Sequence, residues 1–325
     1  MRAFIAVTIA GSLVASGLMT CELRAQNYPD RPIRTIVPFP AGGLADAVAR
    51  IVGQKLGDRL GGSLVIENRT GASGTLGAGV VAKSPADGYT LLITTGDFVT
   101  MSGIMPALSF DPSKELMPIT MLAAAPAILV ANSAAGMHSV RDVIDAARAR
   151  PGAIPYSSPG VGTTNHLAME GLAIAAGIKL LHVPYRGGAP AATAVAAGDV
   201  PIGCVTPSSG EGLIQSGKVK VVALMSKQRP SFAPDWPTLA DAGIDIDASL
   251  WVGLFAPAGT AAAIVDKLDA EATGILRSAE TQRALNSVGT DAAAISQAAF
   301  AQRIRAEAAR YAVIIQKTGF RAPQQ

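Results

Sequence analysis

The chain has 325 residues, of which 49% are hydrophobic, 16% charged and 5% aromatic, and its formal net charge at pH 7 is +3. The apolar content excludes an intrinsically disordered protein, and the length allows two domains with a core in each. Because the net charge is small and the Lys and Arg residues are scattered, we expect no nucleic-acid partner.

The N-terminal segment differs in character from the rest of the chain. An apolar run at residues 3–19 is followed by a cleavage-type sequence that ends at Ala25, which predicts a signal peptide over residues 1–26 and therefore an exported protein. Two alternatives stay open: an uncleaved membrane anchor, and a lipid anchor on Cys21. Cleavage would leave Cys204 as the single cysteine, which we expect to be a small core residue.

Strands and helices alternate along the first half of the chain, a pattern typical of α/β folds with parallel sheets. Apolar runs predict strands at residues 33–39, 63–68 and 90–94. Periodic segments predict a helix at Leu44–Leu60 and a second helix that ends near Lys83. The apolar run at residues 119–131 is long enough to cross from one domain to another.

The second half repeats the alternation. Strands are predicted at residues 154–158, 179–184, 200–206, 219–226 and 251–257. Helices are predicted at residues 139–150, 164–176, 189–197, 261–277, 280–288 and 297–317.

Three strand-to-helix loops share one design: VPFPAGGLAD at residues 37–46, SPGVGT at 158–163 and YRGGAP at 185–190. Each loop places glycines between a strand end and a helix start, where close backbone approach and unpaired N–H groups favour anion binding. A purely structural turn remains an alternative for any one loop. Because the loops come from both halves of the chain, they predict one ligand held between two lobes.

Six motifs carry a resemblance to a known family: YPDRPIRTIVPFPAGGLADAVAR at residues 28–50, VIENRTGASGTLGA at 65–78, SPADGYTLLI at 84–93, SSPGVGTTNHLA at 157–168, HVPYRGGAPA at 182–191 and WVGLFAPAGT at 251–260. In these motifs the chain resembles the substrate-binding proteins of tripartite tricarboxylate transporters, the Bug family. The resemblance covers essentially the whole chain after the predicted signal peptide, in the right order.

The resemblance implies an α/β, two-lobed periplasmic binding protein of the type II-like class, with a ligand cleft between the lobes. Residues 27–127 and 251–325 would form the first lobe, and residues 128–250 the second. The chain would cross between them near Ala127 and near Leu250, and the C-terminal helices would pack on the first lobe.

The family binds small carboxylates, so the resemblance implies a monomeric binding protein, not an enzyme, with no cofactor and no metal. It would deliver a small organic carboxylate or dicarboxylate, aromatic ones included, to the permease subunits of a tripartite transporter or to a sensor. The family's ligand-binding positions fall on Phe39, Ala41, Gly42, Gly43, Asp46, Thr95, Ser158, Gly160, Gly162, Thr163, His166, Tyr185, Arg186 and Gly187. Arg186 has two open roles: bidentate binding of a carboxylate, or a salt bridge within the protein.

Two positions depart from the family pattern. Val205 stands where members often carry an acidic residue suited to an amino group, so amino acids become less favoured as ligands. Phe98 and Val99 would make the wall after Thr95 more apolar. Both departures favour a dicarboxylate with an apolar or aromatic body.

An exported carboxylate-ester hydrolase is the alternative function, with Ser158 as nucleophile and His166 as base. The sequence YSSPG around Ser158 lacks the G-x-S-x-G elbow of such enzymes. His166 is therefore expected to be a hydrogen-bond donor or a core residue of a helix, and His182 an isolated structural residue. Asp245 and Asp247 lack further ligands, so they predict a solvated loop rather than a metal site.

Overall fold

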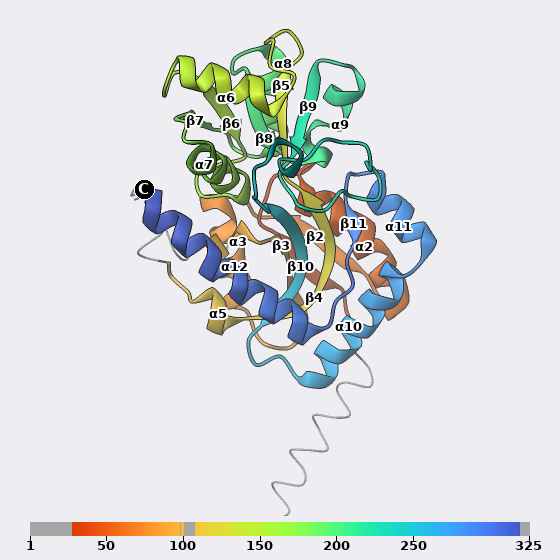
Figure 1. Cartoon of the computed structure of the whole chain (residues 1–325). Helices are drawn as coiled ribbons and strands as arrows, with labels where there is room; N and C mark the ends of the chain where they lie inside the picture. Colours follow the sequence, from red (N-terminus) through yellow and green to blue (C-terminus); the bar gives the residue numbers. More distant parts are fainter. Residues whose placement is uncertain (1–27, 98, 101–107, 319–325) are drawn as a thin grey trace, which may run out of the picture.

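The computed structural model describes residues 28–97, 99–100 and 108–318; the predicted signal peptide, Cys21 and Phe98 lie outside these residues. The described strands form two sheets with helices packed around each, so the chain folds into two α/β lobes (Figure 1). None of the helices in these ranges combines the length and the apolar character needed to cross a membrane.

The sheet of the first lobe is mixed rather than parallel. Its described strands are β1 (Ile33–Val37), β2 (Leu64–Asn68), β3 (Thr90–Thr95), β4 (Leu116–Pro126), β10 (Ser249–Pro257) and β11 (Asp291–Ala292), in the spatial order β11-β4-β10-β3-β1-β2. β1 is parallel to β2 and β3, whereas β10 is antiparallel to β3 and β4. The parallel pairing expected from the alternation holds for β1, β2 and β3, whereas β4 leads out of the lobe and β10 leads back into it antiparallel to its neighbours.

The second sheet contains β5 (Ile128–Asn132), β6 (Pro155–Ser158), β7 (Leu181–Pro184), β8 (Ile202–Val205) and β9 (Val219–Leu224), in the spatial order β7-β6-β8-β5-β9. β6 is parallel to β7 and β8, and β5 is antiparallel to β8 and β9. Here too, the strand that enters from the other lobe, β5, is antiparallel to its neighbours.

Helices cover both sheets, and the bounds of the helices predicted with residue ranges lie within a few residues of the prediction. Those that pack around the first sheet are α2 (Leu44–Leu60), α3 (Thr75–Ala82), α5 (Pro112–Glu115), α10 (Ala262–Leu276), α11 (Ala279–Asn286) and α12 (Gln297–Thr318). Those of the second lobe are α6 (Val140–Ala149), α7 (Thr164–Ala176), α8 (Gly188–Ala197) and α9 (Pro207–Gln215). Two short 3₁₀ helices, η1 (Ala72–Gly74) and η2 (Ala240–Ala242), lie in connecting loops.

The predicted single strand at residues 119–131 is two strands, separated at Ala127. β4 pairs with β10 in the first sheet and β5 pairs with β8 and β9 in the second, so the backbone has to change sheets between them. At this point the N–H of Ala127 donates to the carbonyl oxygen of Ala248 at 3.3 Å, beside the start of β10 at Ser249. The outward and return connections between the lobes therefore lie side by side.

Helix α12 packs on the first lobe and also reaches the second. It contacts β4 and α7, and Figure 1 shows it running along the front of the first lobe towards α7. Its buried Glu307 accepts a hydrogen bond from the indole N–H of Trp251 at 2.5 Å, and its Phe300 packs edge-to-face on the same ring. These contacts fix α12 to β10, the strand that enters from the second lobe.

Candidate functional site: a cleft between the lobes

A cleft of about 530 Å³, part of it open to solvent, lies between the two sheets. It is formed at the carboxyl ends of β1, β3, β6 and β8, the position where ligands bind in open α/β sheets. The first lobe lines it with Phe39, Pro40, Ala41, Gly43, Leu44, Ala45, Thr95, Asp97 and Leu250. The second lobe lines it with Pro159, Asn165, Gly187, Gly188, Ala189, Pro190, Thr206 and Ser209.

The start of α2 presents unpaired backbone N–H groups to this cleft. Its N-cap residue is Gly43, whose backbone is extended and which has no side chain to cap the helix. The first backbone bond of the helix runs from the N–H of Ala47 to the carbonyl oxygen of Gly43 at 3.0 Å, so the N–H groups of Leu44 and Ala45 have no acceptor among the described residues. Such a helix start favours a negatively charged group.

The loop before α2 is held in shape by Asp46, which does not itself line the cleft. Its carboxylate accepts hydrogen bonds from the N–H of Gly42 at 3.0 Å, the guanidinium of Arg50 at 2.9 Å and the amide of Asn68 at 3.0 Å. Burial acts to raise the pKa of Asp46, but these donors lower it overall, so the group is ionised. Asp46 is thus a support for the loop rather than a ligand contact.

The start of α8 is a second uncapped helix start, on the opposite lobe. Its N-cap Gly187 has φ +116°, a conformation that requires glycine, and provides no capping side chain. The N–H of Ala191 bonds to the carbonyl oxygen of Gly187 at 3.3 Å, and the third helical residue, Pro190, has no N–H. The N–H groups of Gly188 and Ala189 are therefore without an acceptor in the described part of the chain, and both residues line the cleft.

At the start of α7, by contrast, two N–H groups are bonded to side chains of the protein. Thr163 caps it, accepting from the N–H of His166 at 3.3 Å. Asp97, which follows β3 in the other lobe, accepts from the N–H of Thr164 at 2.8 Å and from the hydroxyl of Thr95 at 3.0 Å. Burial raises the pKa of Asp97, although the hydrogen bonds from Thr164 and Thr95 act in the opposite direction.

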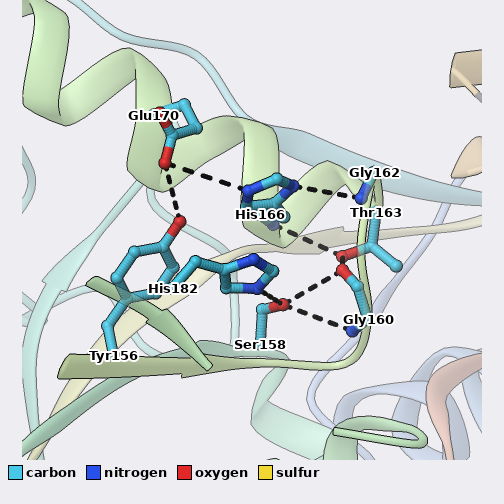
Figure 2. Close-up of polar contacts among 8 residues, drawn as sticks. All are labelled: Tyr156, Ser158, Gly160, Gly162, Thr163, His166, Glu170 and His182. Atoms are coloured by element: carbon cyan, nitrogen blue, oxygen red, sulfur yellow. Dashed lines mark hydrogen bonds and ion pairs between the residues drawn. The ribbon is translucent and has the colours of Figure 1, made fainter. Parts of the chain in front are cut away.

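A polar cluster behind the cleft fixes the loop between β6 and α7 (Figure 2). The hydroxyl of Ser158 lies 2.7 Å from Nε2 of His182, and the ring of His182 stacks on that of His166 with centroids 3.8 Å apart. Nδ1 of His166 accepts from the N–H of Gly162 at 3.0 Å. Burial lowers the pKa of His166 to about 3 and that of His182 to about 4, so both rings are neutral at pH 7.

Comparison with known proteins places this architecture in a family. The family model described as "Tripartite tricarboxylate transporter family receptor" matches residues 48–320. The chain belongs to the tripartite tricarboxylate transporter receptor family. The receptor is therefore a binding protein rather than an enzyme, and the resemblance drawn from the motifs is confirmed.

Curated relatives match over nearly their whole length. The receptor is 33% identical to a protein from the tcbD-tcbE intergenic region of Pseudomonas sp. (strain P51), over 93% of this chain and 91% of that one. It is 31% identical to Protein BugT of Bordetella pertussis, over 96% of this chain and 97% of that one.

Solved structures of similar proteins confirm the predicted two-lobed periplasmic binding protein fold. Rpa4515 of R. palustris with adipate has a TM-score of 0.86 at 30% identity, covering 90% of this chain and 99% of the other. The periplasmic binding protein BugD has a TM-score of 0.83 at 29% identity, with 90% and 99% covered. MatC of Rhodopseudomonas palustris with bound malate has a TM-score of 0.82 at 27% identity, with 89% and 100% covered.

The structure sorts the receptor's fourteen predicted site residues into three groups. Those that line the cleft are Phe39, Ala41, Gly43, Thr95 and Gly187. Those that lie behind it, bonded to other parts of the protein, are Gly42, Asp46, Ser158, Gly160, Gly162, Thr163 and His166. Tyr185 and Arg186 are not among the lining residues, and the exposed Arg186 forms no ion pair with any described residue.

Three expectations about the receptor's side chains are corrected. Ser158 pairs with His182, not with His166, so His182 is not isolated; Ser158 is also fully buried, which leaves the hydrolase alternative without an accessible nucleophile. His166 is a buried residue of α7, as the second alternative predicted, and its Nδ1 accepts the N–H of Gly162. Val205 is fully buried in an apolar cluster, so it says nothing about an amino group in the cleft; Thr206 is the lining residue at that strand end.

Two further residues, Cys204 and Asp97, differ in whether the sequence predicted their place. Cys204 is a fully buried thiol, as predicted for a small core residue, and burial raises its pKa to about 12. Asp97 was not predicted as a site residue. The available signal was an acidic residue directly after a buried strand that ends in two threonines, at the edge of the sheet where ligands bind.

Proposed function

We propose that this receptor captures a small organic carboxylate in the cleft and holds it between the starts of α2 and α8. The observation that carries the proposal is the pair of uncapped helix starts, one from each lobe, whose N–H groups lie in the cleft wall. Each start offers hydrogen bonds and a positive dipole end to an anion.

The residues that line the cleft favour binding of an anion by backbone N–H groups rather than by a cationic side chain. Among the described lining residues there is no Lys, Arg or His, so the positive character of the cleft comes from backbone N–H groups. Because one start lies on each lobe, a carboxylate placed between them would draw the lobes together, and closure would bury the ligand. Adipate and malate, the carboxylates held in two similar structures, fit this chemistry.

The setting follows from the family and from the N-terminal sequence. We propose that residues 1–26 direct export to the periplasm, with release by cleavage near Ala25 and lipidation of Cys21 as the other route. There the closed receptor would present its ligand to the permease subunits of a tripartite transporter, or to a sensor, acting as a monomer.

A thermal-shift screen against citrate, malate, aspartate, glutamate, adipate, nicotinate, benzoate and terephthalate tests the proposal. A ligand at 100 times its dissociation constant adds about 2.7 kcal/mol to the free energy of unfolding, which gives a clear shift. We expect at least one carboxylate to stabilise the receptor and its carboxamide analogue to have no effect. Equal shifts with acid and amide, or no shift with any carboxylate, would contradict the proposal; so would ester cleavage that is lost in Ser158→Ala.

A further inference from the structure

Among the residues that the structure describes, one ionisable side chain lines the cleft. Among the described lining residues only Asp97 carries a titratable group, and it lies directly between the lobes, 5% exposed. It follows β3 of the first lobe, yet it bonds to the N–H of Thr164 at the start of α7 in the second. A carboxyl group in the wall of a carboxylate-binding cleft is unexpected. Burial raises its pKa, but the hydrogen bonds donated by Thr164 and Thr95 favour its ionised form, which has consequences for the ligand.

Asp97 occupies the place that an anion would take at the start of α7. Both of its hydrogen-bond partners in the described part of the chain donate: the N–H of Thr164 to Oδ1 and the hydroxyl of Thr95 to Oδ2. The N–H of His166 is already bonded to the hydroxyl of Thr163. The N–H groups of Thr164 and His166 at the start of α7 are therefore bonded within the protein, whereas those at the starts of α2 and α8 are open.

The cleft thus has two unlike ends. One end has free N–H groups and suits a carboxylate. The other has the carboxylate of Asp97 and, on α7, the amide of Asn165, whereas the hydroxyl of Ser209 lies against Gly188 at the start of α8. A carboxylate placed beside Asp97 would meet a like charge in a poorly hydrated site, whereas a hydroxyl or ammonium group would find an acceptor.

We infer that Asp97 sets the receptor's specificity: it excludes a second carboxylate and selects a monocarboxylate whose far end carries a hydrogen-bond donor, either hydroxyl or ammonium. This inference rests on the proposed function, since it assumes that the first carboxylate binds at α2 and α8. It separates the receptor from the similar proteins whose structures hold adipate and malate, both of which carry two carboxylates.

The test is isothermal titration calorimetry with two matched ligand series. The first is hexanoate, 6-hydroxyhexanoate, 6-aminohexanoate and adipate; the second is butanoate, 4-hydroxybutanoate, 4-aminobutanoate and succinate. Titrations are run at about pH 8, because burial raises the pKa of Asp97 above that of an ordinary carboxyl group. The proteins are the wild type, Asp97→Asn, which keeps the shape and an acceptor oxygen, and Asp58→Asn, which removes an exposed charge at the far end of α2.

We expect the wild type to bind a hydroxy or amino acid at least about tenfold more tightly than the diacid of the same length. Asp97→Asn should strengthen diacid binding by about tenfold or more and weaken binding of the amino acid, because the charge at that end is gone. Asp58→Asn should match the wild type. The order of ligand affinities in the wild type tests the inference even if Asp97→Asn does not fold.

Two results would overturn the inference and leave the proposed function standing: diacids that bind the wild type as tightly as the hydroxy and amino acids, or diacid affinity that is the same in the wild type and in Asp97→Asn. Absence of binding by every acid in both series, in all three proteins, would instead remove the proposed function and the inference together.

Discussion

Replacing Ala189 by proline should weaken carboxylate binding without breaking α8. Ala189 is the second residue of the helix, and its N–H has no acceptor within the described protein, so proline deletes a donor that faces the cleft and no helical hydrogen bond. The preceding residue, Gly188, tolerates the restriction that proline imposes on its neighbour.

The expected size of the effect follows from the number of bonds lost. One N–H bond to a charged acceptor contributes about 1.5–3 kcal/mol, so the dissociation constant for the carboxylate should rise roughly 10- to 150-fold. The melting temperature without ligand should stay close to that of the wild type, because proline in the first turn is compatible with a helix. Calorimetric titration of both proteins with the carboxylate found in the screen measures the change.

A matched variant controls for the altered side chain. Ala189→Ser changes the side chain by one hydroxyl and keeps the backbone N–H, so it should bind within a few-fold of the wild type. If Ala189→Pro folds and binds the carboxylate with wild-type affinity, the N–H of Ala189 is not a ligand contact and the role given to the start of α8 is refuted.

Three further substitutions test the parts that support the site. Burial lowers the pKa of His182 to about 4, so the ring stays unprotonated in the folded protein, whereas in the unfolded chain it takes up a proton near pH 6.5. The free energy of unfolding therefore falls as the pH falls from 7 to 5, and His182→Gln should reduce that loss by about 2 kcal/mol in urea unfolding. No such difference would be seen if the ring were solvated. Asp46→Asn should lower the free energy of unfolding by about 1–3 kcal/mol and weaken ligand binding, since it leaves two donors of the loop poorly paired; unchanged values for both would contradict its supporting role. Gly253→Ala should lower the free energy of unfolding by about 1–3 kcal/mol, because a Cβ there would lie 2.3 Å from the ring of Phe300. Gly212→Ala, whose Cβ would have nothing within 4 Å, should not lower it. Equal effects of the two substitutions in chemical denaturation would disprove the packing argument.

Much of the fold could be predicted because its signals are local. Apolar runs bounded by Gly and Pro predicted most of the strands, and the helix predicted at residues 164–176 has those bounds in the structure. The break at Ala127 was missed because the run remains apolar through it. The break arises because the strand segments on the two sides of Ala127 hydrogen-bond to different sheets. A local sequence pattern does not specify which strands pair.

The candidate site was harder to predict, because its key contacts join distant residues. The loops at Gly43 and Gly187 were visible as glycine-rich turns. In contrast, Ser158 meets His182 through the pairing of β6 with β7, a register that periodicity does not specify. Asp97 reaches the start of α7 across the two lobes, 67 residues along the chain, so its role depends on how the lobes meet.

The central claim is that the ligand's carboxylate lies between the starts of α2 and α8. A crystal structure of the receptor with a carboxylate identified in the screen tests it most directly. The account predicts carboxylate oxygens within hydrogen-bond distance of the N–H groups of Ala45 and Ala189, and no ligand carboxylate at the start of α7. A carboxylate bound instead by Arg186, or one that displaces Asp97 from the N–H of Thr164, would contradict it.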